Sequence, residues 1–345
     1  MTPSRGEYSE AIYVAKGIAI ILIVIGHFQP VEAPPLWYQF REIIYTFHIQ
    51  VFMFLSGFLF AGDKAIANFS QYIDFLKKKA RRLLLPFFSI ATIILILKLL
   101  SGVEYQLVYP ITYESILNLF LNPVESFAST LWFLYVLFEI FIICGAIYLL
   151  TDREYLLIAF SMVCFCLPWI FIFMIGPLFY YLPVFVVGIM CFKHNFFEDQ
   201  PVVIGVAALL LFVVLLLLKD VVPAVDLAQR TYRLGLGVFG AMACFGLSIR
   251  MARRATPGSR CLKFIGSYAL VIYLIHPPVM GMVRFIALAA LPAAARSFLV
   301  LSVIVVTYGV FVPIVLEKYI LRRYKLAGAL ILGNQWPGRS APIPG

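Results

Sequence analysis

The chain has 345 residues, of which 63% are hydrophobic and 13% charged, and its mean hydropathy is +0.98. Soluble domains average about 45–50% apolar and about 25% charged residues, so this composition excludes a water-soluble globular protein. The formal net charge is +10, but the basic residues fall between long apolar stretches and outside any nucleic-acid-binding motif. We therefore expect them to set membrane topology and to contact membrane lipids, with no nucleic acid as a partner.

Ten apolar stretches approach the length of about 20 residues that crosses a bilayer core. In chain order they cover residues 11–28, 43–61, 83–100, 131–150, 155–169, 179–192, 202–218, 234–249, 268–290 and 298–320. The fifth and sixth are short and interrupted by Pro168, Pro177 and Pro183. Glu7 and Glu10 precede the first stretch and no small-residue cleavage site follows it, so we expect it to be retained. The predicted fold is an all-α polytopic membrane protein with about ten transmembrane helices.

The distribution of basic residues predicts that both termini are cytoplasmic. With the N-terminus inside and ten spans, 20 of the 27 Lys and Arg residues fall on the cytoplasmic side, the asymmetry expected from the positive-inside rule. The loop over 101–129 carries three glutamates and no Lys or Arg, so it falls outside. No gap between spans is large enough for a soluble domain. We therefore expect residues 1–345 to form one integral-membrane domain, with a flexible tail over about 334–345.

The six cysteines predict no metal site and no disulfide framework. Nearly all of them lie in apolar runs, and neither a CxxC pair nor a Cys/His spacing typical of metal ligands is present. We interpret them as small hydrophobic residues.

The first span contains two ionisable residues, Lys16 and His27, which are costly inside a membrane and therefore candidates for function. They are eleven positions apart, so at about 100° per residue they lie within about 20° of the same helix face. The same helix separates them by about 16 Å along its axis, with Lys16 towards the cytoplasm. A structural interpretation is also open, in which Lys16 snorkels to the interface and His27 is an ordinary core histidine.

Three more polar residues lie in predicted spans. His48 opens the second span, beside Ser56 and Gly57, which allow close helix packing. Glu139 lies near the middle of the fourth span, where a carboxylate either takes a proton or finds a cationic partner. His276 precedes two prolines that we expect to kink the ninth span. Each is a candidate for a pore or binding site, and each also has a structural interpretation. His48 could be an interfacial histidine, Glu139 a structural tether, and His276 a residue that stabilises the kink.

The run KKKARRLLLP over 77–86 leads into the third span. Clustered Lys and Arg at this position are typical of cytoplasmic anchoring to anionic lipid. They also suit a ligand that carries phosphates, because Arg supplies a bidentate fork and Lys a point charge.

Six segments together resemble the membrane acyltransferase-3 family, particularly its fucose-4-O-acetylase-like branch. They run in family order and are AKGIAIILIVIGH (15–27), FHIQVFMFLSGFLF (47–60), KKKARRLLLPFF (77–88), LWFLYVLF (131–138), LPVFVVGI (182–189) and FIGSYALVIYLIHPP (264–278). The family motif of a basic residue, ten residues and a histidine is met by Lys16 and His27, with Lys in place of the commoner Arg. The family's paired basic motif is met by Lys79 and Arg82.

The chain departs from the family pattern at two points. Gln50 stands where the branch usually has proline, although His48 is kept. The chain also lacks the SGNH esterase-like domain that is fused to some relatives, which suggests direct transfer by the membrane domain.

The resemblance implies an O-acyltransferase of the cell inner (plasma) membrane. It would move an acyl group, most often acetyl, from cytoplasmic acyl-CoA to a hydroxyl of an envelope glycan or its lipid-linked precursor, with no tightly bound cofactor. His27 would be the general base, and Lys16, Lys79 and Arg82 would bind the donor. A pore or acceptor site would use His48, Glu139, Trp132 and His276. The alternative is a proton-coupled transporter or channel in which Lys16, His27 and Glu139 form a relay. A structural or assembly subunit is a third interpretation, but it gives Lys16 and His27 no reason to share a face.

Overall fold

A computed structural model describes residues 5–28, 30, 32–62, 66–100, 111–151, 153–170, 172–292 and 296–333, with side chains from residue 8 onward. Over these residues the chain forms helices and no strands. The tail predicted over 334–345 and residues 101–110 of the predicted outer loop lie outside the described ranges.

Eight of the described helices have the length and apolar composition of a membrane span. They are α1 Arg5–His27, α2 Pro35–Gly62, α3 Phe69–Leu100, α5 Trp132–Leu150, α7 Ile175–Lys193, α9 Asp226–Arg254, α11 Ala269–Ala290 and α12 Phe298–Leu316. Two further apolar helices are shorter: α6 Glu154–Cys166 and α8 Pro201–Leu217. Each predicted span thus coincides with a helix, and the all-α polytopic membrane fold is confirmed. The number of spans and the side of each terminus remain predictions.

Three helices lie where the sequence suggested connecting segments. The predicted outer loop contains α4 Tyr113–Leu121, which begins where the Thr112 hydroxyl accepts a hydrogen bond from the Ser115 backbone N–H. Thr256 caps α10 Pro257–Ser267 in the same way. The third is α13 Lys325–Leu332. Side-chain caps on α4 and α10, and the packing of α13 against α3, account for these additions. All three segments carry too few apolar residues to span a membrane.

Some helix boundaries also differ from the predicted ones. The basic run over 77–86 belongs to α3 itself, because that helix begins at Phe69, well before the apolar stretch. Helix α7 continues through Pro183, and α11 continues through Pro277 and Pro278. The prolines therefore end neither helix.

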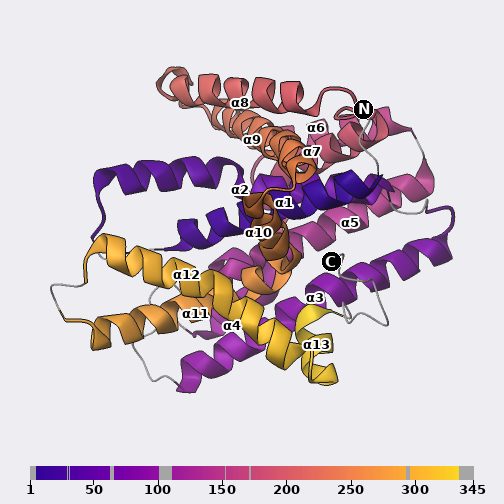
Figure 1. The fold of residues 1–345 in the computed structure, drawn as a ribbon. Coiled ribbons are helices and arrows are strands. Elements are labelled where there is room, and N and C mark those ends of the chain that lie inside the picture. The colour runs from indigo at the N-terminus through magenta and orange to yellow at the C-terminus, as the bar shows by residue number, and fades with distance from the viewer. Residues whose placement is uncertain are drawn as a thin grey trace.

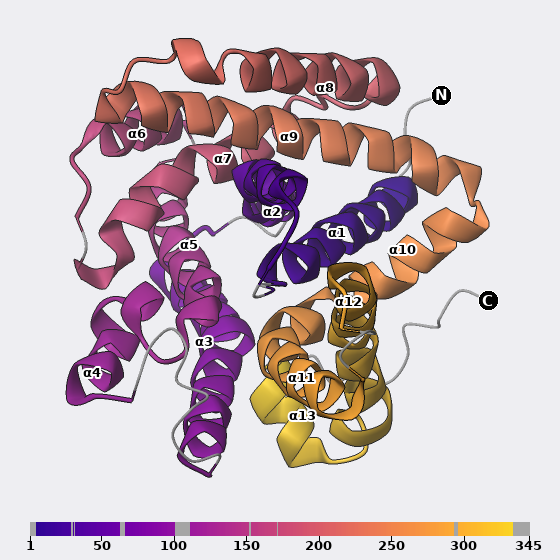
Figure 2. The same ribbon diagram turned by 90° about the vertical axis from the view of Figure 1, so that its left-hand side faces the viewer.

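Helices α1 and α2 lie at the centre of the bundle (Figures 1 and 2). Helix α1 packs against α2, α9, α10, α11 and α12, and α2 packs against α7 and α9. Figure 2 shows α8 and α9 running along one edge, α11, α12 and α13 gathered near the opposite edge, and α3 and α5 side by side on one flank. A residue on the inner face of α1 can therefore reach side chains from distant parts of the sequence.

Helices α1 and α10 approach each other unusually closely, and two glycines make this possible. A Cβ atom at position 266 would lie 1.8 Å from the Tyr13 carbonyl oxygen, and one at position 17 would lie 2.1 Å from the Leu262 carbonyl oxygen. Small residues at such contacts let helix backbones meet directly. Helix α10 is thereby held against the first half of α1, near Lys16.

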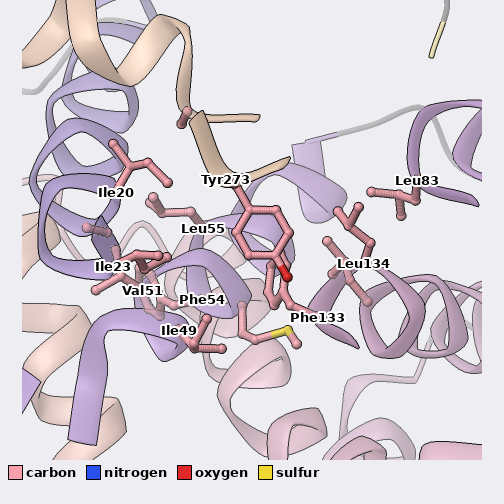
Figure 3. Close-up of a cluster of buried hydrophobic side chains, with 14 of the residues drawn as sticks. Ile20, Ile23, Ile49, Val51, Phe54, Leu55, Leu83, Phe133, Leu134 and Tyr273 are labelled. Carbon is pink, nitrogen blue, oxygen red and sulfur yellow. The ribbon is translucent and has the colours of Figure 1, made fainter. Parts of the chain in front are cut away.

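Figure 3 shows a cluster of buried apolar side chains from several helices. It includes Ile20 and Ile23 of α1, which lie between Lys16 and His27 along the helix. The other labelled members come from α2, α3, α5 and α11 and are Ile49, Val51, Phe54, Leu55, Leu83, Phe133, Leu134 and Tyr273. We call the side of the bundle with Lys16 and Arg82 the basic end, and the side with His27 the histidine end.

Candidate active site

His27, the last residue of α1, forms a hydrogen bond with His276 in the first half of α11. Its Nδ1 atom lies 2.6 Å from Nε2 of His276, and the ring planes are inclined by 12° with centroids 4.9 Å apart. His276 is completely buried. The pair joins residues 249 positions apart in the sequence, and it exists because α1 packs against α11.

The backbone of α11 fixes which ring nitrogens carry protons in the neutral pair. His276 Nδ1 lies 2.8 Å from the Ile272 carbonyl oxygen and 2.9 Å from that of Tyr273. Because carbonyl oxygens only accept, His276 Nδ1 carries the proton and its Nε2 is an acceptor. His27 Nδ1 must then donate to His276, which leaves the Nε2 atom of His27 unprotonated. This is the tautomer that a general base requires.

Helix α2 supplies the other groups around His27. The His48 ring donates from Nδ1 to the Ile44 carbonyl oxygen at 2.7 Å, and His48 is buried. His48 and Arg41 both act electrostatically on His27. The Tyr45 ring meets His27 edge-on at 6.4 Å and His48 at 4.9 Å between centroids.

Arg41 and Tyr45 were not among the residues selected from the sequence. Arg41 Nε and the Tyr45 hydroxyl donate to the Gly26 carbonyl oxygen at 2.8 and 3.2 Å. They thus satisfy a carbonyl at the end of α1 that has no partner within the helix, and hold His27 in place. The sequence did contain a pattern that could have identified them as neighbours of His48, because positions 41, 45 and 48 have the i, i+4, i+7 spacing of one helix face.

Lys16 lies on the same face of α1 as His27, towards the opposite end of the helix. We call this face, formed by positions 16, 20, 23 and 27, the α1 stripe. The Lys16 ammonium is 5.7 Å from the centroid of the Tyr13 ring, and Arg82 of α3 acts on it electrostatically. The structure therefore brings Lys16 and Arg82 together at the basic end. The buried side chains of Ile20 and Ile23 fill the space along α1 towards His27.

Lys79 and Arg82 occupy different surroundings on α3. The Lys79 ammonium lies over two aromatic rings, 4.3 Å from the centroid of Phe141 and 5.0 Å from that of Phe75. Arg82 lies where the end of α13 docks on α3, since a Cβ at Gly333 would come within 2.7 Å of the Arg82 Cα atom. Gly333 has a φ of +60°, which favours glycine. Helix α13 is therefore part of the wall around the basic end.

Glu139 and Trp132 are both on α5 and have neighbours other than the histidine pair. Among the described residues, Glu139 forms no ion pair and its Oε2 atom has no hydrogen-bond partner. The Glu139 carboxyl group acts electrostatically on Tyr135. The Trp132 ring is tilted by 34° to that of Tyr181, with 5.4 Å between centroids, and it lines a cavity of about 1170 Å³ between α2, α5, α7 and α9. Tyr45 lines this cavity as well, and its ring also contacts His27.

Comparisons with known proteins identify the family of the chain. The chain is 33% identical over 135 residues to nodulation protein NolL of Mesorhizobium japonicum, a match that covers 37% of this chain and 33% of that protein. The matched part thus spans about a third of the length of that relative. No solved structure gives a significant match. The family described as Acyltransferase domain, the acyltransferase-3 family, matches residues 10–317, which include Lys16, His27, Lys79, Arg82 and His276. The chain therefore belongs to the acyltransferase-3 family, and its helices have the length and composition of a multi-pass membrane protein.

Proposed function

We propose that this protein is an O-acyltransferase of the plasma (inner) membrane that transfers acetyl from cytoplasmic acetyl-CoA to a hydroxyl of an envelope glycan or lipid-linked sugar. We place it in the fucose-4-O-acetylase-like branch on the six sequence segments described above. The observation that carries the proposal is the hydrogen bond between His27 and His276 in a chain of an acyltransferase family, because the tautomer it implies leaves the Nε2 atom of His27 free to accept a proton.

The histidine pair supports a direct transfer without an acyl-enzyme. The Nε2 atom of His27 takes the proton of the acceptor hydroxyl as the oxygen attacks the thioester carbonyl carbon. The tetrahedral intermediate then collapses, the carbon–sulfur bond breaks, and the proton on His27 Nε2 passes to the departing CoA sulfur. The products are the ester and the free thiol. His276 Nε2 accepts from His27 Nδ1 throughout, so it stabilises the transient imidazolium. The positive charge of Arg41 beside His27 favours the negative charge that develops on the carbonyl oxygen.

The basic end suits the anionic part of the donor. CoA carries phosphates, for which Arg82 offers a bidentate fork and Lys16 and Lys79 offer point charges. The α1 stripe leads from Lys16 past Ile20 and Ile23 to His27, over about 16 Å. The pantetheine arm of CoA is long and thin, so it fits this route if the apolar side chains move aside.

Mass spectrometry of the envelope glycan tests the proposal. Glycan from cells that express the wild-type protein should carry an added acetyl group that is absent without the protein. His27→Ala at matched membrane abundance should give the unmodified mass, because a general base contributes about 10²–10⁴-fold to the rate. Normal acetylation by His27→Ala would remove His27 from the mechanism, and an unchanged glycan with the wild-type protein would contradict the proposed acceptor class.

A further inference from the structure

The cavity between α2, α5, α7 and α9 contains a buried polar group that the transfer step does not use. Gln50 lines the cavity and is only 3% exposed. Its side chain lies beside the Tyr180 hydroxyl, and its Oε1 atom has no hydrogen-bond partner among the described residues. A buried carbonyl oxygen without a partner costs about 1–3 kcal/mol, so a ligand that donates to it would be favoured.

The packing around Gln50 leaves room for this side chain. A Cβ atom at Gly237 of α9 would lie 2.6 Å from Cγ of Gln50 and 3.2 Å from its Nε2 atom. Any larger residue at 237 would therefore displace the amide. By contrast, the amide of Gln229, at the rim of the same cavity, donates to the Val222 and Pro223 carbonyl oxygens. Of these two glutamines, Gln50 is the one whose Oε1 atom is buried without a partner among the described residues.

Aromatic rings form the walls beside Gln50. Trp132 and Tyr181 lie 5.4 Å apart, Tyr180 and Tyr181 meet edge-to-face at 4.9 Å, and Trp169 lies 6.5 Å from Tyr180, measured between centroids. The negative face of an aromatic ring attracts the C–H groups of a sugar ring, while a sugar's hydroxyls need hydrogen-bond partners at its edge. Aromatic walls with a few placed polar groups are typical of small-molecule sites.

The charges of the lining indicate a neutral ligand. Three acidic and three basic residues line the cavity, so their formal charges cancel; they are Glu42, Asp220, Asp226, Lys219, Arg230 and Arg233. Four of these residues form two salt bridges: Lys219 with Glu42 at 2.7 Å and Arg230 with Asp226 at 2.9 Å. A polyanion such as CoA suits the basic end better. The volume of about 1170 Å³ exceeds the usual range of about 300–1,000 Å³ for ligand pockets, which favours more than one sugar ring.

We propose that this cavity binds the acceptor as a neutral oligosaccharide stacked on Trp132 and Tyr181, and that Oε1 of Gln50 accepts a hydrogen bond from one of its hydroxyls. Gln50 is then a residue that determines acceptor specificity. This proposal rests on the proposed function and adds to it the location at which the acceptor binds. Tyr45 connects the two sites, since it lines the cavity and its ring contacts His27.

Binding can be measured without acyl transfer. The protein has four tryptophans, and Trp132 and Trp169 line the cavity. In a Trp37→Phe/Trp336→Phe background, tryptophan fluorescence reports on the cavity alone. The probe is the neutral oligosaccharide fraction released from the envelope of cells that lack the protein, treated with mild base to remove esters. The purified protein is titrated in nanodiscs, with and without the added change His27→Ala.

We expect saturable quenching that is equal with and without His27→Ala. Gln50→Met, which keeps the side-chain length, should weaken binding by about five- to tenfold, the value of one hydrogen bond. The matched control is Gln71→Met, since Gln71 is exposed and its Oε1 atom accepts from Ala67 at the basic end. Trp132→Leu should weaken binding as well, and size-exclusion profiles show whether each variant is folded.

Two results would overturn the inference. Equal affinity of folded Gln50→Met and wild type would remove Gln50 from acceptor recognition. Absence of quenching by any oligosaccharide of the fraction would remove the acceptor from the cavity. If glycan acetylation still depended on His27 in either case, the proposed function would stand and only the placement of the acceptor would fail. If acetylation failed but the oligosaccharide bound, the cavity would stand as a sugar site without the proposed reaction.

Discussion

The Nδ1 atom of His27 lies 2.6 Å from the Nε2 atom of His276, and the backbone of α11 holds His276 in the tautomer that accepts this hydrogen bond. The arrangement corresponds to the base and the orienting group of a catalytic triad, with a second histidine in the orienting position. Different substitutions of His276 can distinguish a role in orienting His27 from a purely structural role.

His276→Gln should retain more activity than His276→Ala. The glutamine Oε1 atom can take the place of the histidine Nε2 atom and accept from His27 Nδ1, whereas alanine leaves that N–H unpaired. We expect His276→Ala to lower kcat by about 10²-fold or more, with little change in the KM for acetyl-CoA. Steady-state kinetics of the purified variants measure both constants. Equal loss in the two variants would show that His276 only fills space.

Lys16→Met should raise the KM for acetyl-CoA, and Lys16→Arg should restore most of the affinity. The reason is that Lys16 and Arg82 lie together at the basic end, where their charge attracts the phosphates of the donor. The control is Lys77→Met on α3, because Lys77 is exposed and paired only weakly with Asp74 at 3.9 Å. An unchanged KM for Lys16→Met would return Lys16 to the role of an interfacial anchor.

Arg82→Ala should weaken acetyl-CoA binding by about 10- to 100-fold, the value of a charge-assisted hydrogen bond. Arg82→Lys should recover only part of this, because lysine lacks the bidentate fork. Equilibrium binding of acetyl-CoA to the purified protein measures the effect, with the neighbouring exposed residue changed in Arg81→Ala as the control. If Arg82→Ala and Arg81→Ala bind the donor equally well, the basic run is a topology signal.

Gly266→Ala should destabilise the protein by about 1–3 kcal/mol or more, because the new Cβ would fall 1.8 Å from the Tyr13 carbonyl oxygen and force α10 away from α1. Thermal unfolding in detergent, followed by loss of the monodisperse peak, measures the change. Gly258→Ala in the same helix is the matched control, since the nearest atom to its Cβ is 4.0 Å away. Similar unfolding temperatures of the two variants would contradict the close α1–α10 contact.

The contact between Glu154 and Lys193 should make stability depend on pH in the acid range. The hydrogen bond from Lys193, at 2.9 Å, and that from His194 hold the pKa of Glu154 below its ordinary value. A group with a lowered folded pKa stabilises the fold above its unfolded pKa of about 4.3, and the effect is lost as the pH falls through the folded pKa. The difference in Tm between wild type and Glu154→Gln should therefore be constant above about pH 6 and shrink below about pH 4. A difference that does not change with pH would exclude this carboxylate as its source.

The sequence was enough to predict the helices, because the physical rule behind them is local. A backbone inside a bilayer must satisfy its own hydrogen bonds, so an apolar stretch of sufficient length forms a helix whatever its neighbours. The common stripe of Lys16 and His27 also follows from the helical repeat alone. The short helices α4, α10 and α13 were missed because caps and tertiary packing, not apolar length, hold them.

Only the tertiary structure decided which polar residues meet. His27 and His276 are 249 positions apart, and no local pattern encodes the packing of α1 on α11 that joins them. The same holds for Gln50, which packs against Gly237 of another helix and whose Oε1 atom has no partner among the described residues, and for Trp132, which lines the cavity. The physical reason is that a helix repeat fixes the face on which a side chain lies, whereas its partner is fixed by which helices pack against that face.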